Sequence, residues 1–217
     1  MQAIEIVERL ERCYTGALYD AMREKGFTKC VLPYEIKPLN YDWHLAGPVF
    51  TVSGHREQGI SEHETLLSWT DMLSKVPAGS VVVCQPNDTQ LAHMGELSAE
   101  TLDIRGARGY IVDGGCRDVP YILNRNFRVF CRYVTPDDIV GKWIVDSIME
   151  NIRIGEVEIN NGDFIAADRD GIVVIPSGMV IEVLKRAEEL MVTESELRKA
   201  IRQGMDPKQA YLKYGVF

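Results

Sequence analysis

The stretch GYIVDGGCRDVPYI, Gly109–Ile122, decides the fold because it joins a buried strand to a helix through a glycine turn. The run GYIV is short and apolar and ends at a turn, as buried strands do, and DVPYILNRN then has helical spacing. Related units flank it on both sides: PVFTVSG with SEHETLLSWTDMLSKV and GSVVVCQ with GELSAETLDIRG before it, and RVFCRYV after it. This alternation predicts β-α-β units around a largely parallel, buried sheet.

The chain changes its pattern after residue 142. Period-2 runs are interrupted there by NNGD (160–163) and DRDG (168–171), and such turn sequences between β-rich runs predict antiparallel hairpins. Residues 1–22 have the spacing of one amphipathic helix, and residues 179–204 that of a long helix ending at Gly204. We therefore expect one mixed α/β domain over residues 1–217, with a β/α layer, a β-rich layer and helices at both ends.

Composition limits the classes of function. The 217 residues carry a formal net charge of −8, with the basic residues scattered, so a protein that binds the phosphate backbone of nucleic acids is not expected. The longest apolar runs are the length of strands, which predicts that no segment crosses or binds a membrane. The amino terminus lacks the features of a secretory signal, and the five cysteines form no C-x-x-C pair, so we expect a cytoplasmic protein without disulfides or a zinc knuckle.

Two segments place polar residues just after predicted parallel strands, where the carboxyl ends of the strands meet at one edge of the sheet. These residues are Asp88, His93, Gly95 and Glu96 in one segment, and Asp113, Gly114, Gly115, Arg117 and Asp118 in the other. The run Gly95–Ser98 also opens a helix, whose first backbone N–H groups have no partner within the helix and suit a carboxylate or a phosphate.

This combination suits a small 2-oxo acid. Its carboxylate would lie on the Leu97 and Ser98 amides, and a divalent metal ion on Asp118 would chelate the carboxylate and keto oxygens. Arg117 would stabilise the enolate that forms when the neighbouring C–C bond breaks, and Glu96 would orient the waters of the metal. Neither segment contains a lysine for a Schiff base.

A purely structural interpretation stays open beside this one. The glycine pair can be a tight turn, with Asp118 as the N-cap of the following helix and Arg117 in a surface salt bridge. His93 can be a satisfied polar group or a loop residue without a role in binding. Cys116 lies between Gly115 and Arg117, and it would act as a nucleophile only with a base beside it.

Four segments in this order resemble one known family, the RraA-like proteins: GALYDAM, AGPVFTV, MGELSAETLDIRGARGYIVDGGCRDV and NNGDFIAADRDGIVVIP. The resemblance covers about residues 10–205. The family includes class II pyruvate aldolases that cleave 4-hydroxy-4-methyl-2-oxoglutarate and 4-carboxy-4-hydroxy-2-oxoadipate. The resemblance implies a β/β/α sandwich like the swivelling phosphohistidine domain, and homotrimers or hexamers with sites at subunit boundaries.

The resemblance also implies roles for particular residues. The aldolases carry an Asp, then twenty residues, then Arg-Asp; here Glu96 is followed by twenty residues and then by Arg117 and Asp118. Asp118 thus resembles the metal ligand, Arg117 the group that stabilises the oxyanion and holds pyruvate, and Gly95 to Ser98 the cradle of the carboxylate. Glu96 departs from the family by one methylene. That difference leaves the substrate and the rate open.

Two further family features match less closely. After the next strand the family has Ala-Arg-Gly, where this chain keeps Arg132 but has no glycine after it. The family also supplies a glutamate from the carboxyl-terminal helix of a neighbouring subunit. Glu194 matches that position best, Glu196 is the close alternative, and a solvated helix face is the structural interpretation of both.

The sequence thus predicts a cytoplasmic lyase that depends on Mg²⁺ or Mn²⁺. The enzyme would release pyruvate from a 4-hydroxy-2-oxo acid, or decarboxylate oxaloacetate, through a metal-bound enolate. The alternative comes from another class, since the family also includes a regulator that binds and inhibits a ribonuclease by protein contact. The acid at Glu96 favours the enzyme, because members of the regulator type tend to lack the leading acid.

Overall fold

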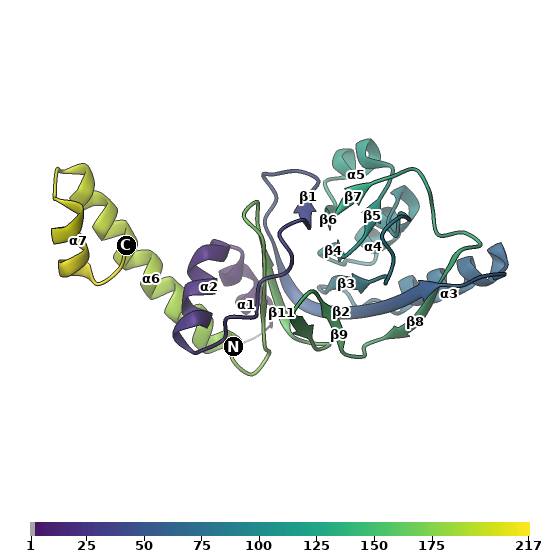
Figure 1. The fold of residues 1–217 in the computed structure, drawn as a ribbon, viewed down its shortest axis with the longest axis horizontal. Coiled ribbons are helices and arrows are strands. Elements are labelled where there is room, and N and C mark those ends of the chain that lie inside the picture. Colours follow the sequence, from purple (N-terminus) through teal and green to yellow (C-terminus); the bar gives the residue numbers. More distant parts are fainter. Residues whose placement is uncertain (1–2) are drawn as a thin grey trace.

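The computed structural model describes residues 3–217, which form a curled mixed sheet with helices on its outer sides (Figure 1). The helices are α1 (Ala3–Leu10), α2 (Thr15–Glu24), α3 (Glu62–Lys75), α4 (Glu96–Ile104), α5 (Val119–Arg125), α6 (Val180–Arg202) and α7 (Pro207–Tyr214). The strands are β1 (Lys37–Pro38), β2 (Leu45–Arg56), β3 (Val81–Gln85), β4 (Gly109–Val112), β5 (Gly115–Cys116), β6 (Arg128–Cys131), β7 (Tyr133–Val134), β8 (Trp143–Ile148), β9 (Ile152–Ile154), β10 (Val157–Ile159), β11 (Phe164–Ala167) and β12 (Ile172–Ile175).

The parallel half of the sheet is confirmed. Strands β2, β3, β4 and β6 pair in parallel and in that order, and α3, α4 and α5 connect them. Both faces of these strands are buried, because Val81 and Val83 enter one hydrophobic cluster and Val82 and Cys84 enter another. The run VVVC is therefore apolar throughout and does not alternate with polar residues.

The second half is antiparallel, as expected, although one turn has another role. DRDG joins β11 to β12 in a hairpin. NNGD does not join partners, because β10 pairs with β9 whereas β11 pairs with β2 and β12. The β9–β10 hairpin turns instead at Gly155, which has a φ of 60°. A turn sequence thus marks where the chain bends, and the packing of the apolar faces decides which strands pair.

Strand β2 links the two halves of the sheet. Its first part pairs with β3 and β11, and its last residues pair with β8 across an irregularity between Ser53 and Gly54. The indole of Trp143 crosses Gly54 so closely that an added Cβ would lie 2.0 Å from its ring. This contact requires a glycine, and it places β8 beside α3, next to the edge that carries the candidate site.

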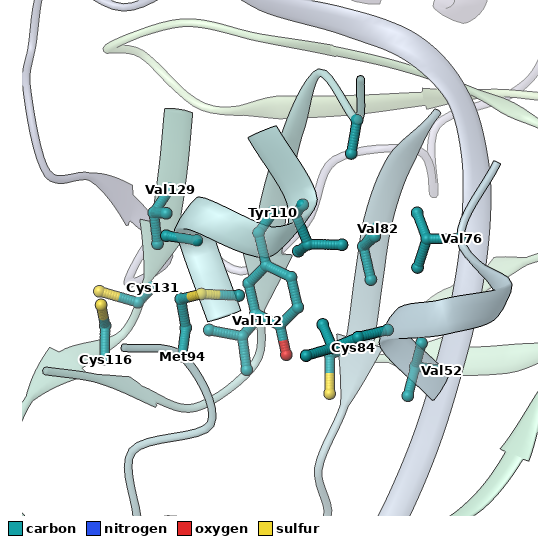
Figure 2. Packing of buried hydrophobic residues seen from close by; sticks show 14 of the residues in the cluster. Val52, Val76, Val82, Cys84, Met94, Tyr110, Val112, Cys116, Val129 and Cys131 are labelled. Atoms are coloured by element: carbon teal, nitrogen blue, oxygen red, sulfur yellow. The ribbon is translucent and has the colours of Figure 1, made fainter. Parts of the chain in front are cut away.

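Three hydrophobic clusters hold these layers together. The largest lies between the parallel strands and helices α3 to α5, and Figure 2 shows part of it, with Tyr110 and Val112 of β4 beside Cys84 of β3. A second cluster packs α1, α2 and α6 against β11 and β12. The third fills the inside of the curl, where Ile154 of β9 meets the sheet. The first cluster is the one that supports the strand ends of the site.

The amino-terminal helical segment differs from the expectation, whereas the long helix at the other end is confirmed. The expected single helix is interrupted between α1 and α2. The buried Asp168 carboxylate accepts hydrogen bonds from the Thr15 backbone N–H and hydroxyl, and these bonds fix the start of α2. At the other end α6 stops at Arg202, and Gly204, with a φ of 91°, leads into the additional helix α7. Figure 1 shows α6 extending from the body with α7 folded back along it. Within residues 3–217, no helix has the length and apolar character needed to cross a membrane.

Candidate functional site

Backbone hydrogen bonds join the two candidate segments edge to edge. The His93 N–H donates to the Gly115 carbonyl at 2.9 Å, and the Arg117 N–H donates to the Met94 carbonyl at 2.9 Å. The approach is close, since a Cβ on Gly115 would lie 2.5 Å from the Leu91 carbonyl oxygen. The structure therefore brings Gly95 and Glu96 beside Arg117 and Asp118, although about twenty residues separate them in sequence.

Asp118 connects the starts of two helices. It is the N-cap residue of α5, but its side chain does not cap that helix; instead Asp118 Oδ2 accepts a hydrogen bond of 3.0 Å from the Glu96 N–H, at the start of α4. Its backbone is left-handed, with φ 57° and ψ 33°, a conformation that costs free energy in a residue other than glycine. Gly95 allows the approach, because a Cβ there would lie 2.7 Å from Asp118 Oδ2.

Arg117 lies between two carboxylates. Its Nη1 is 2.8 Å from Asp138 Oδ2 and its Nε is 3.4 Å from Asp118 Oδ2, while its side chain remains 39% exposed. The sequence analysis did not single out Asp138. The signal was present, because Asp138 follows the next parallel strand, β6, and so returns to the same edge of the sheet. These ion pairs hold the guanidinium at the mouth of the site and leave donors free.

The start of α4 offers backbone donors. The first bond within the helix runs from the Ala99 N–H to the Gly95 carbonyl, so the amides of Glu96, Leu97 and Ser98 precede the helical ladder. Asp118 takes the first of them. In the part of the chain that the structure describes, the Leu97 and Ser98 amides have no partner, and they carry the positive end of the helix dipole.

These groups line one end of a cavity of about 390 Å³, a volume typical of small-molecule sites. Glu96, Arg117, Asp118 and Asp138 give this end its charge. The apolar part of the lining comes mainly from α3 and the loop after Asp138. Its lining residues are Leu66, Trp69, Thr70, Leu73, Ile139 and Val140. The site thus combines a charged end with an adjoining apolar wall.

The charged end suits a hard cation held mostly by water. Asp118 Oδ2 is engaged, whereas Asp118 Oδ1 has no partner among residues 3–217, and the side chain is 36% exposed. No group of three or more His, Cys, Asp or Glu side chains within those residues forms a closed metal site. A single carboxylate oxygen beside open space fits Mg²⁺ or Mn²⁺, which keep several water ligands. It does not fit a zinc ion with four protein ligands.

His93 borders the cavity but is almost completely buried. Its ring packs edge-on against Trp143, with centroids 5.2 Å apart, and neither ring nitrogen has a hydrogen-bond partner within the described chain. The nearest charge is Asp88, whose Oδ2 is 3.7 Å from Nε2. Burial lowers the pKa of His93 to about 4, although Asp88 opposes the shift, so the imidazole is neutral at pH 7.

Three other candidates, Cys116, Glu194 and Glu196, do not line the cavity of their own chain. The Cys116 side chain is buried, and Figure 2 shows its sulfur next to that of Cys131. A hydrogen bond with Cys131 and burial raise the pKa of the Cys116 thiol, which is the reverse of what a nucleophile needs. Glu194 accepts a hydrogen bond from the Tyr14 hydroxyl of its own chain, and Glu196 is exposed on α6. Neither glutamate lines the cavity described above.

Comparison with known proteins gives consistent relatives. The model of the RraA-like family, Aldolase/RraA, matches residues 15–174. A Halalkalibacterium halodurans protein named "Putative 4-hydroxy-4-methyl-2-oxoglutarate aldolase" is 29% identical over 210 residues, which cover 97% of this chain and 95% of that protein. "Protein DlpA" of Legionella pneumophila is 29% identical over 214 residues, and these cover 96% of this chain but 34% of that protein, so the chain spans about a third of that relative.

A solved structure shares the fold over most of its length. It is a crystal structure described as one of novel cellulases from microbes associated with the gut ecosystem, with a TM-score of 0.86 and 32% identity over 90% of this chain and 88% of that one. The likeness shows that the two proteins share the overall fold.

Proposed function

This chain belongs to the RraA-like family, and from that premise we propose that it is a divalent-metal-dependent lyase. It would cleave a C–C bond of a small 2-oxo acid and release pyruvate from a 4-hydroxy-2-oxo acid. The name of the Halalkalibacterium halodurans relative supports this class of reaction. The proposal extends to oxaloacetate decarboxylation, because loss of CO₂ from that acid leaves the same pyruvate enolate.

One observation carries the proposal: three kinds of group that suit a 2-oxo acid meet at one end of one cavity. These are the free amides of Leu97 and Ser98, the guanidinium of Arg117 and the open oxygen of Asp118. The amides match a carboxylate, and a guanidinium matches an oxygen that gains negative charge. The salt bridge to Asp138 at 2.8 Å holds Arg117 in place before the substrate arrives.

The chain's own residues would act as follows. The substrate carboxylate accepts hydrogen bonds from the Leu97 and Ser98 amides, which orients the 2-oxo group toward Arg117. When the C3–C4 bond breaks, its electron pair moves to the pyruvate half and the 2-oxo oxygen gains charge, which Arg117 stabilises by donating hydrogen bonds. The 4-hydroxyl loses its proton as C4 becomes a carbonyl, and C3 then takes up a proton.

Asp118 would hold a divalent cation, and Glu96, which also lines the charged end, would orient water around it. Such a cation supplies Lewis acidity, which draws electrons toward the 2-oxo oxygen and lowers the barrier to bond cleavage. We also propose that the chain assembles into trimers or hexamers in which a neighbouring subunit contributes a glutamate, Glu194 or Glu196. Light scattering of the purified protein would test the assembly.

The test is pyruvate release by the purified protein from oxaloacetate and from 4-hydroxy-2-oxo acids, with Mg²⁺ or Mn²⁺ and then with EDTA. Metal-only reactions give the background. We expect release to require protein and metal together, and Asp118→Ala to abolish it while the fold is kept. Asp71→Ala, which removes an exposed carboxylate on α3 that pairs with Lys75, is the matched control and should retain activity. No release from any of these acids would favour the regulator class of the family.

A further inference from the structure

Apolar side chains line the cavity next to the groups that would hold the pyruvate half of the substrate. Helix α3 contributes Leu66, Trp69 and Leu73 to this wall, and the loop after β7 adds Ile139 and Val140. The wall begins directly beside the first turn of α4, because Trp69 is hydrogen-bonded to Ser98. A 4-hydroxy-2-oxo acid held by its carboxylate and keto oxygens would place its C4 substituent along this wall.

This wall is fixed in place before anything binds. The Trp69 indole N–H donates to the Ser98 hydroxyl at 2.9 Å, which ties α3 to the first turn of α4. The ring of Trp69 also packs edge-on against Trp143, with centroids 5.9 Å apart. Leu66, one turn earlier on α3, is 46% exposed and extends the apolar surface outward. A rigid apolar wall gains free energy from apolar substituents without having to order itself first.

Among the described residues, the cavity lining offers no free cationic side chain for a second anionic group. Three carboxylates line it, those of Glu96, Asp118 and Asp138, against the single guanidinium of Arg117. Arg117 is already paired with Asp138 and lies near Asp118, and the buried His93 is neutral. The substrate's first carboxylate has the α4 amides. With a divalent cation on Asp118 these charges nearly balance, but a second carboxylate would still lie against apolar side chains with no cationic side chain to pair with, which disfavours its burial.

We propose that the substrate is a 4-hydroxy-2-oxo monocarboxylic acid with an alkyl or aryl group at C4. Cleavage of its C3–C4 bond yields pyruvate and an apolar aldehyde or ketone: the 4-hydroxyl gives up a proton, C3 gains one, and no oxidant or reductant takes part. The inference rests on the proposed lyase function and specifies its substrate.

The test compares two acids that differ only at their far end. 4-Hydroxy-2-oxohexanoate ends in a methyl group, and 4-hydroxy-2-oxoadipate ends in a carboxylate at the same position. Pyruvate release is followed with saturating Mg²⁺ or Mn²⁺. We expect kcat/KM for the hexanoate to exceed that for the adipate by at least tenfold, and to rise about fourfold with each methylene added as far as the wall extends.

A lysine added to the wall should reverse this preference. Thr70 lines the cavity on the exposed side of α3, so Thr70→Lys places an ammonium group where the adipate carboxylate would lie. We expect the hexanoate-to-adipate ratio of kcat/KM to fall by tenfold or more. Ser74→Lys, one turn further along α3 and outside the cavity lining, is the control and should leave the ratio unchanged. An unchanged ratio in Thr70→Lys would show that this wall does not face the substrate.

An independent assay separates failure of this inference from failure of the lyase function. Exchange of the pyruvate methyl protons with D₂O, followed by proton NMR, needs only the charged end of the site. Metal-dependent exchange together with equal or preferred cleavage of the adipate would refute the substrate class and leave the lyase function standing. No exchange and no cleavage of either acid would refute both.

Discussion

Alanine at Gly95 tests the geometry of the site most directly. Its Cβ would lie 2.7 Å from Asp118 Oδ2, 3.2 Å from Arg117 Cγ and 3.3 Å from Arg117 Nε, whereas ordinary contacts begin near 3.4 Å. The Asp118 carboxylate must therefore retreat by about 0.7 Å, and the 3.0 Å hydrogen bond from the Glu96 N–H is lost or stretched. The backbone has a φ of −148°, which alanine adopts readily, so the effect is steric.

Two magnitudes follow for Gly95→Ala. Loss of a hydrogen bond to a charged group should lower the free energy of unfolding by about 1–3 kcal/mol. A displacement approaching 1 Å at the reacting groups should lower kcat by roughly 10². Urea unfolding measures the first, and metal-dependent pyruvate release measures the second. Because a Cβ at Gly178 would meet no atom within 4 Å, Gly178→Ala is the matched control. Turnover of Gly95→Ala within threefold of wild type would refute the close approach of Asp118 to α4.

Three other substitutions test separate parts of the structure. Arg117→Lys should lower kcat by roughly 10² in steady-state kinetics, because the point charge of an ammonium group cannot replace the planar fork of the guanidinium. It should lower the free energy of unfolding, measured in urea, by less than about 1 kcal/mol. Equal losses of transition-state stabilisation and of folding stability would indicate a structural salt bridge. The pKa of His93 is about 4, below its unfolded value, so the folded state is destabilised as the pH falls. Between pH 6.5 and pH 4 the free energy of unfolding of wild type should therefore fall by about 3 kcal/mol more than that of His93→Gln, as measured by urea unfolding at each pH. If the imidazole were solvated, the two proteins would show parallel pH profiles. Ser61→Ala removes the capping box with Glu64 and should cost about 1 kcal/mol in thermal unfolding, without changing kcat.

The parallel half of the fold was predictable because its signals are local. Runs such as VVVC are apolar on both faces, and helical segments of ordinary length separate them, with Ser61 and Glu64 marking the start of α3. The pairing of the other strands was harder to predict from the sequence. NNGD was correctly identified as a turn, with Gly162 at a φ of 90°, but Phe164 pairs with Pro48, more than a hundred residues earlier. Turn chemistry is local, whereas partner choice depends on which apolar faces pack.

The break in the amino-terminal helix has the same kind of cause. The spacing of residues 1–22 suits one helix, and no glycine or proline interrupts it before Gly16. The break is made by Asp168, which takes both the backbone N–H and the hydroxyl of Thr15 from 153 residues away. A buried carboxylate that finds two donors outweighs the local preference for a continuous helix. The carboxylate of Asp138 differs, because its position after a parallel strand could have indicated that it returns to the same sheet edge as Arg117, and only the ion pair itself depends on how the two segments pack.

The Arg-Asp pair after the glycine turn is explained by a carboxylate that serves a helix other than its own. An Asp at an N-cap ordinarily turns its oxygens toward the amides two or three residues ahead, which would fix Asp118 over α5. The left-handed backbone of Asp118 is instead accompanied by a carboxylate bound to the first amide of α4, with one oxygen left open to the cavity. That conformation costs roughly 1–2 kcal/mol, and the backbone bonds of Arg117 to Met94 and of His93 to Gly115 hold the segment against relaxation. The strain and the charge thus lie on the same residue, which agrees with the proposal that Asp118 holds a cation.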